Sequence, residues 1–229
     1  MNAATQAAQP TIRAVIFDMD GLMLDTERLA QQAWQRSGAE LGYPLPDELY
    51  LQAIGRTAAA TEVLLRNGFG ADFPFPEIYA RKQQYYHEAL EQAIPTKPGL
   101  FELLALVEAL GLPKAVATST ARPLALKKLT AAGLLNYFPV IVCGDEIAHG
   151  KPAPDIFLAA AAKLAIAPAH CLVLEDSPAG IQAAHAAGMT PIHVPDLIAP
   201  SPETRRLAYQ VVASLHEVGP LLEQLAREQ

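Results

Sequence analysis

Short, continuous runs of apolar residues recur along the chain and predict the strands of a β-sheet. Continuous rather than alternating hydrophobicity is typical of parallel strands that are covered on both faces. Each run is too brief for a helix and ends in polar or turn residues. The predicted strands cover residues 14–17, 115–117, 140–143, 172–174, 191–194 and 210–213.

Helix-length patterns alternate with these runs, and the alternation predicts the fold class. Candidate helices lie at residues 100–110, 123–132, 154–163 and 179–187, and an amphipathic helix follows the last strand. Regular alternation of strand and helix favours a doubly wound α/β domain with right-handed crossovers. We therefore expect a Rossmann-like core with a central parallel sheet.

The stretch between the first and second predicted strands departs from this rhythm, because it contains helical patterns only. Its candidate helices are 28–41, 47–53, 57–67 and 76–91. We expect an inserted all-helical cap domain at residues 27–94, ending near IPTKPG, whose prolines and glycine are typical of a linker. The core then comprises residues 11–26 and 95–229, and residues 1–10 form a flexible leader.

The balance of charges narrows the class of partner. The chain has 17 Lys and Arg against 24 Asp and Glu, a formal net charge of −7, without a visible basic cluster. Nucleic-acid backbones are held by such clusters, so we expect no nucleic acid as a partner. No run approaches the ~20 apolar residues of a membrane span, and we expect no membrane partner. Cys143 and Cys171 sit in or beside apolar runs and are read as reduced, buried thiols of a cytoplasmic protein.

Polar residues that could take part in catalysis or binding follow four of the predicted strands. The carboxyl ends of parallel strands meet at one edge of a sheet, where ligands bind. The residues are Asp18 and Asp20 after the first strand, Thr118 and Ser119 after the second, Lys151 in the loop after the third, and Glu175 and Asp176 after the fourth.

Each of these residues has a plainer explanation when it is taken alone. Acids at strand ends often cap the next loop or helix, and Glu175 and Asp176 fit that role. Thr118 and Ser119 fit an N-cap, and a single lysine such as Lys151 is usually a surface residue. Their joint occurrence favours a functional site, because several acids at one edge repel one another unless a positive charge lies between them. A bound divalent cation is the simplest source of that charge.

Residues of these types, gathered at one edge of a sheet, suit reactions of phosphate esters. Mg²⁺ prefers oxygen ligands, and Asp18 and Asp176 with a main-chain oxygen near Asp20 could supply them. A carboxylate beside the metal can attack phosphorus, and a neighbouring carboxylate can protonate the leaving oxygen and then deprotonate water. Thr118 and Lys151 would bind the oxygens of the transferring phosphoryl group.

Four segments carry a resemblance to a known family: DMDGLMLDTE, VATST, HGKPAPDIF and LEDSPAGIQAAHAAGM. In this order they resemble the motifs of the haloacid dehalogenase-like hydrolases, over about residues 11–195. The similarity is to the branch with a helical cap after the first motif, which includes β-phosphoglucomutase-like and pseudouridine-5'-phosphatase-like proteins. The resemblance implies a Rossmann-like core, a mobile cap, Mg²⁺ as the cofactor and phosphate-ester chemistry.

The resemblance also implies a role for each motif residue. Asp18 would be the nucleophile and Asp20 the general acid and base, while Thr118 and Lys151 would bind the phosphate. The metal would lie among Asp18, Asp20, Glu175 and Asp176.

Several activities fit this resemblance, and the motif residues favour one of them. We expect a Mg²⁺-dependent phosphatase for a small phosphomonoester, either a sugar phosphate or a compound like a nucleoside monophosphate. A phosphomutase like β-phosphoglucomutase is the alternative, but its cap histidine corresponds to Ala30 here. Asp20 and Asp176 argue against a metal-free dehalogenase. A non-catalytic binding protein would have lost a nucleophile or a metal ligand, and none is lost.

Substrate choice is expected to come mainly from the cap. We take Glu27, Arg56 and Ser119 as candidate substrate-binding residues, although Arg56 in its Gly-Arg-Thr turn fits a plain helix start equally well. Trp34 is expected in the hydrophobic core. The partner would be a small phosphorylated metabolite, and the protein a monomer or a weak homodimer.

Overall fold

The computed structural model describes residues 10–54, 56–92 and 94–226, which form two compact units. One unit is Asp25–Pro95, the cap. The other, the core, consists of the chain up to Leu24 and from Thr96 onward. The expected leader lies outside the described residues, except for its last residue, Pro10.

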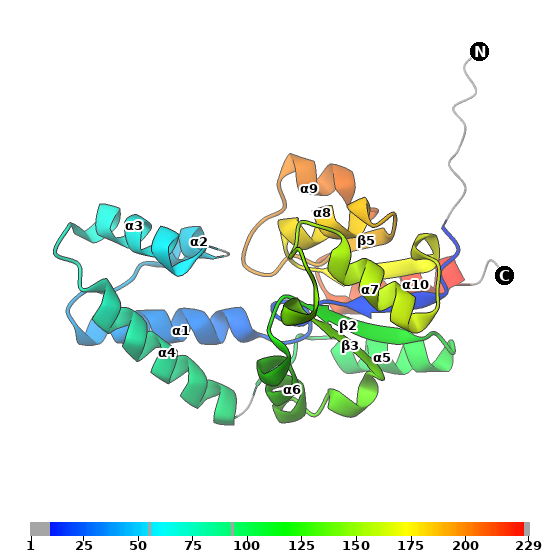
Figure 1. Cartoon of the computed structure of the whole chain (residues 1–229), viewed down its shortest axis with the longest axis horizontal. Coiled ribbons are helices and arrows are strands. Elements are labelled where there is room, and N and C mark those ends of the chain that lie inside the picture. Colours follow the sequence, from blue (N-terminus) through cyan, green and yellow to red (C-terminus); the bar gives the residue numbers. More distant parts are fainter. Residues whose placement is uncertain (1–9, 55, 93, 227–229) are drawn as a thin grey trace, which may run out of the picture. The chain divides into compact units, whose positions relative to one another are not determined.

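The core is built on a six-stranded parallel sheet, which confirms the predicted fold class (Figure 1). The strand order is β3-β2-β1-β4-β5-β6, with β1 near the centre. β1, β2, β4 and β5 are buried along their whole length, which explains their unbroken apolar runs. The strands are β1 (Ala14–Phe17), β2 (Lys114–Thr118), β3 (Val140–Cys143), β4 (Cys171–Glu175), β5 (Thr190–His193) and β6 (Gln210–Val211).

The last strand is shorter than the sequence predicts. Pairing of β6 ends at Val211, whereas the apolar pattern extends to Ala213. The backbone N–H of Ala213 donates to the carboxylate of Glu217, 3.1 Å away, in the next helix. The donor that a longer strand would use therefore already serves the start of that helix.

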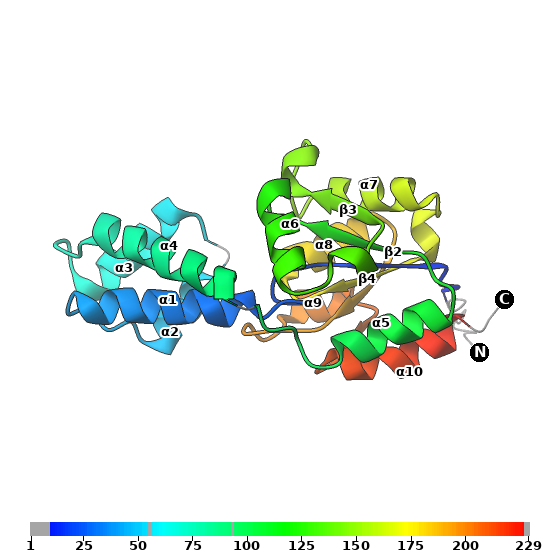
Figure 2. The same ribbon diagram turned by 90° about the horizontal axis from the view of Figure 1, so that it is seen from below.

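Helices cover both faces of the sheet (Figure 2). α5 and α10 pack against each other on one face, while α7 and α8 lie on the other. Ile16, Ala117 and Val173 of the sheet meet Phe157 of α7 and Ala184 of α8 in a fully buried cluster. The core helices are α5 (Leu100–Ala109), α6 (Arg122–Ala131), α7 (Asp155–Leu164), α8 (Pro178–Ala186), α9 (Pro202–Leu207) and α10 (Leu215–Ala226).

The sequence patterns did not predict α9. This helix has six residues, PETRRL, which are too few and too polar to show a helical period. It is fixed locally instead, because the hydroxyl of Ser201 accepts from the backbone N–H of Thr204 as an N-cap.

The cap consists of four helices, as predicted: α1 (Thr26–Glu40), α2 (Asp47–Ala53), α3 (Ala58–Phe69) and α4 (Phe75–Gln92). α1 and α4 pack side by side (Figure 1). Trp34 is 7% exposed and packs against Phe75 and Tyr79, so the expectation that it is a core residue holds. Among the described residues, none of the helices has both the length and the apolar character needed to cross a membrane.

Candidate active site

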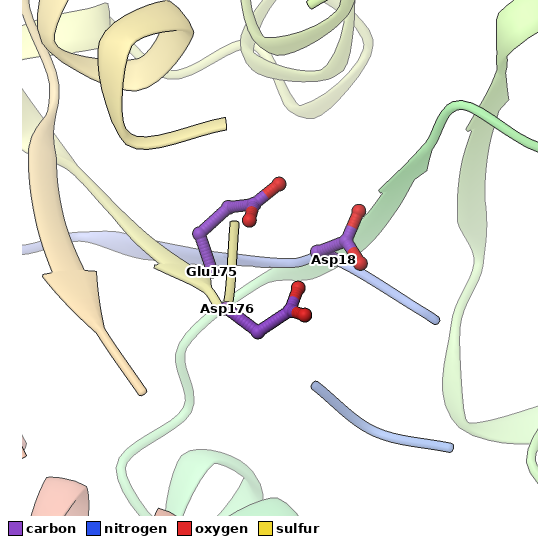
Figure 3. A group of neighbouring side chains, drawn as sticks. All are labelled: Asp18, Glu175 and Asp176. Carbon is purple, nitrogen blue, oxygen red and sulfur yellow. The ribbon is translucent and has the colours of Figure 1, made fainter. Parts of the chain in front are cut away.

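The candidate site lies at the carboxyl ends of β1 and β4, where the strand order reverses. In such sheets this topological switch point is where ligands bind. Asp18 directly follows β1, and its backbone N–H donates to the carbonyl of Leu174 in β4 at 3.0 Å. Glu175 ends β4 and Asp176 comes next, so three acids meet at adjacent strand ends (Figure 3).

Lys151 joins two of these acids in a buried cluster. Its Nζ lies 2.5 Å from Oδ1 of Asp18 and 2.6 Å from Oε1 of Glu175. The Lys151 side chain is 6% exposed, and those of Asp18 and Glu175 are 8% and 1% exposed. At such burial an unpaired charge is very costly, so each carboxylate needs the ammonium.

Burial and charge shift the pKa values in this cluster. Burial raises the pKa of Asp18 to about 7, although the ammonium of Lys151 acts in the opposite direction. Burial alone would lower the pKa of Lys151, but the carboxylates of Asp18 and Glu175 together raise it above its ordinary value. Lys151 is therefore a permanent cation, and further positive charge beside Asp18 would favour its ionised carboxylate.

Glu175 is held in place by donors other than Lys151. The backbone N–H and the hydroxyl of Ser177 lie 2.7 Å and 2.9 Å from its Oε2. Gly180 in α8 leaves room for this carboxylate, because a Cβ at residue 180 would overlap with it. Ser177 also caps α8 by accepting from the N–H of Gly180 at 3.0 Å. The capping role considered for Glu175 and Asp176 thus belongs to Ser177.

The three acids provide a set of oxygen atoms that fits a divalent cation. One carboxylate oxygen from each of Asp18, Glu175 and Asp176 lies within 4.8 Å of the others. The three acids thus gather at one edge of the sheet, with Lys151 beside two of them. All-oxygen donors of this kind suit Mg²⁺.

Two neighbours position Asp176 in this group. Gly21 has a φ of +83°, and a Cβ there would collide with the Asp176 carboxylate, so only glycine lets the loop after β1 approach so closely. On the other side, Nε2 of His193 lies 2.8 Å from the main-chain oxygen of Asp176. Burial lowers the pKa of His193, so the neutral ring donates to that oxygen.

Asp20 is oriented differently from Asp18. Its Oδ2 accepts from the hydroxyl of Thr120 at 2.7 Å, and its Oδ1 lies 2.6 Å from Nζ of Lys128. Its carboxylate is not part of the three-acid group found among the described residues. Asp20 was expected among the metal-binding residues, and its carboxylate instead contacts Thr120 and Lys128.

Thr118 and Ser119 lie at the end of β2 in different environments. Thr118 is 1% exposed, and its hydroxyl accepts from the backbone N–H of Thr120 at 3.1 Å. Ser119 is exposed. Neither residue caps α6, whose N-cap is Ala121 without a side-chain hydrogen bond.

Glu27 and Arg56, the candidate substrate-binding residues of the cap, line one cavity of about 240 Å³ within that unit. The carboxylate of Glu27 accepts from the Tyr50 hydroxyl at 3.1 Å, and Nε of Arg56 donates to a main-chain oxygen at 2.6 Å. Trp34, Tyr50, Tyr79, Tyr86 and Lys82 also line this cavity. Nζ of Lys82 lies 5.8 Å and 4.9 Å from the ring centroids of Trp34 and Tyr86.

Reasoning from the sequence assigned no role to four residues of the site: Thr120, Lys128, Ser177 and His193. Ser177 before Pro178 is an N-cap signal and could have been found. Lys128 left a weaker signal, since it shares a helical face with the apolar residues Ala125 and Leu129.

Comparisons with known proteins agree with this geometry. A family model described as haloacid dehalogenase-like hydrolase matches residues 12–188. A protein of Drosophila melanogaster named "Probable pseudouridine-5'-phosphatase" is 37% identical over 211 residues, which cover 90% of each chain. A Thermotoga maritima protein named "Phosphorylated carbohydrates phosphatase" is 32% identical over 182 residues, covering 80% of this chain and 84% of its own.

Solved structures show the same fold. A HAD family hydrolase from Deinococcus radiodurans, with bound phosphate and sodium, matches with a TM-score of 0.85 at 28% identity. The match covers 94% of this chain and 97% of that chain. A β-phosphoglucomutase from Clostridium difficile, at a TM-score of 0.71 and 24% identity, covers 95% and 98% and shares the fold.

The chain belongs to the haloacid dehalogenase-like hydrolases, because the family model matches most of its length and two relatives exceed 30% identity. It is an enzyme of this family, a hydrolase of phosphoric monoester bonds.

Proposed function

We propose that this phosphatase is Mg²⁺-dependent and hydrolyses a small phosphomonoester through an aspartyl-phosphate on Asp18. One observation carries the proposal: Asp18 lies 2.5 Å from the buried ammonium of Lys151 and belongs to a group of three acids. A carboxylate beside fixed positive charge can approach an anionic phosphate without strong repulsion.

In the first step, an Asp18 oxygen attacks phosphorus while the bond from phosphorus to the ester oxygen breaks. The proton of Asp20 goes to the leaving oxygen, so the alcohol departs neutral. Lys151 and the Thr118 hydroxyl bind the oxygens of the phosphoryl group, where charge is held in the transition state.

In the second step, Asp20 takes a proton from water, which attacks the phosphorus of the aspartyl-phosphate. The bond to Asp18 breaks, and inorganic phosphate and the free carboxylate result. Mg²⁺ would be held by Asp18, Asp176 and a main-chain oxygen at Asp20, with Glu175 beside it. It would supply positive charge against the phosphate and the acids.

Substrate choice is assigned to the cap cavity. Its aromatic walls from Trp34, Tyr79 and Tyr86 offer flat apolar surfaces, while Glu27 and Arg56 offer an acceptor and a donor. Such a lining suits the face and the hydroxyl groups of a sugar or a nucleoside. The names of the two relatives, one for a nucleotide-like ester and one for carbohydrate phosphates, support this range. Ser119, exposed at the end of β2, is the proposed contact from the core.

The phosphomutase alternative receives less support. Ala30, which stands where the resemblance implies a mutase histidine, lines the cap cavity without a titratable group. Water is then the acceptor of the phosphoryl group that we propose. We further propose that the enzyme acts in the cytoplasm as a monomer or a weak homodimer. Its two cysteines, Cys143 and Cys171, are free and buried, as in a reducing compartment.

Phosphate release from a panel of esters tests the proposal. The panel contains pseudouridine 5'-phosphate, hexose 6-phosphates, β-glucose 1-phosphate and phosphoglycolate, each with Mg²⁺ and with EDTA. The Asp18→Asn variant is the blank. Metal-dependent release that the blank lacks is the expected result. Glucose 6-phosphate formed from β-glucose 1-phosphate, without phosphate release from any ester, would make the enzyme a mutase.

A further inference from the structure

A second buried lysine lies beside the site, and the mechanism above gives it no role. Lys128 is on α6, with its side chain only 5% exposed, between the fully buried residues Ala125 and Leu129 of the same helical face. A lysine is rarely so buried without a counter-charge, because desolvation disfavours the ammonium. Its Nζ lies 2.6 Å from Oδ1 of Asp20.

The carboxylate of Asp20 is engaged at both oxygens. Lys128 contacts Oδ1, and the hydroxyl of Thr120 donates to Oδ2 at 2.7 Å. The backbone of Asp20 is itself constrained by a β-bridge to Leu24. With the backbone fixed, the side-chain torsions decide where the carboxylate points, and these two donors set them.

The two aspartates of the first motif thus have separate cationic partners. Asp18 pairs with Lys151 at 2.5 Å, and Asp20 pairs with Lys128 at 2.6 Å. A carboxylate two residues from the nucleophile would otherwise be drawn to Lys151 or to the cation proposed for the three-acid group. A carboxylate drawn to either of these would no longer point toward the leaving oxygen, so anchoring it separately on Lys128 favours proton transfer.

We propose that Lys128, together with Thr120, is a positioning residue that keeps the Asp20 carboxylate apart from the nucleophile and the metal group, ready for proton transfer. This inference rests on the proposed function, in which Asp20 protonates the leaving oxygen. Without Lys128 the carboxylate turns, and protonation of the leaving group is what suffers.

The leaving group provides the readout. An alkyl phosphate releases a strongly basic alkoxide and needs the proton, whereas p-nitrophenyl phosphate releases a stable phenolate and needs it little. We therefore measure kcat and KM with Mg²⁺ for glycerol phosphate and for p-nitrophenyl phosphate. The variants are Lys128→Met, Lys128→Arg and Thr120→Val. Lys127→Met, at the exposed neighbouring position on α6, is the matched control.

Lys128→Met is expected to lower kcat/KM for the alkyl ester by about 10- to 100-fold, and for the aryl ester by no more than a few-fold. The two esters are compared by kcat/KM, which reports the steps up to release of the alcohol, because the second step, in which Asp20 takes a proton from water, is common to both esters and affects kcat alike. Lys128→Arg restores part of the rate, Thr120→Val shows a smaller loss of the same kind, and Lys127→Met behaves as the wild type.

Asp20→Asn separates this inference from the proposed function. It should show the same selective loss on the alkyl ester, and adding Lys128→Met to it should change the ratio of the two esters no further. If Asp20→Asn shows the selective loss in kcat/KM and the Lys128 and Thr120 variants lower kcat/KM equally for both esters, the positioning role is wrong and the mechanism stands. If Asp20→Asn lacks the selective loss, the acid role of Asp20 fails and the inference falls with it. Lys128→Arg and Thr120→Val decide the matter should Lys128→Met not fold.

Discussion

Replacing the proposed nucleophile with its neutral isostere is expected to stabilise the metal-free protein while it abolishes turnover. Asp18 is buried, and burial raises the pKa of its carboxyl to about 7 despite the nearby ammonium of Lys151. In the unfolded chain this carboxyl returns to its ordinary pKa near 4. Between these two values the folded protein binds a proton that the unfolded chain has lost, so the free energy of unfolding falls as pH rises.

The magnitude follows from the separation of the two pKa values. The ordinary value of 3.8 and the folded value of about 7 differ by about three units. At ~1.4 kcal/mol per unit, ionised Asp18 costs the fold about 4 kcal/mol above pH 7. Asp18→Asn removes this titration and keeps the pair of Lys151 and Glu175 at 2.6 Å. The free energy of unfolding of the variant, relative to that of wild type, should therefore rise by about 3 kcal/mol as the pH increases from about 5 to about 8.

Urea unfolding in EDTA measures this difference at several pH values. Trp34 is the single tryptophan and lies in the cap, so circular dichroism is the better probe of the core. Asp72→Asn, the same exchange at an exposed position, is the control. The claim that burial of the Asp18 carboxylate destabilises the fold would be refuted by an Asp18→Asn protein less stable than wild type at pH 8. It would equally be refuted by a stability difference that is the same at pH 5 and pH 8.

Three further predictions follow from the site and the cap. Gly180→Ala places a methyl group on the Glu175 carboxylate, so it should lose activity at least about 10-fold and lower stability by roughly 1–2 kcal/mol. Gly219→Ala in α10, where a Cβ meets only an ordinary contact but the next residue is Pro220, should instead leave activity and stability nearly unchanged; equal effects of the two variants in urea unfolding would contradict the packing argument. Mg²⁺ at about 100 times its Kd should raise the free energy of unfolding by ~2.7 kcal/mol in wild type and far less in Asp18→Asn, and an unchanged thermal midpoint would exclude a site at these acids. Lys82→Met should raise KM more than it lowers kcat, since it removes binding common to ground and transition states; a change in kcat alone would argue against the cap cavity as the recognition site.

The sheet could be predicted from the sequence because its strands are buried on both faces. Runs such as residues 14–17 and 140–143 leave no polar position, and their observed bounds are the predicted ones. The same reasoning fails for α9, which is polar, short and fixed by the Ser201 cap. Local hydrogen bonds of this kind leave no periodic pattern to detect.

Part of the candidate site could likewise be predicted from the sequence, and part could not. Strand ends converge at one edge, so the meeting of Asp18, Glu175 and Asp176 was predictable from topology. The direction of the Asp20 carboxylate was not, because it depends on side-chain torsions. Lys127 and Lys128 are adjacent in the sequence, and only the packing of α6 determines which of them is buried against Asp20.

The central claim is that the phosphoryl group passes to Asp18 before water receives it. The direct measurement is a rapid acid quench of enzyme, Mg²⁺ and the best ester of the panel during turnover, followed by peptide mass spectrometry, with Asp18→Asn as the control. Our account predicts a phosphoryl adduct on the peptide that carries Asp18, formed and lost at rates that match phosphate release, and no adduct in the variant. Phosphate release without any adduct on that peptide, or turnover that survives in Asp18→Asn, would contradict it.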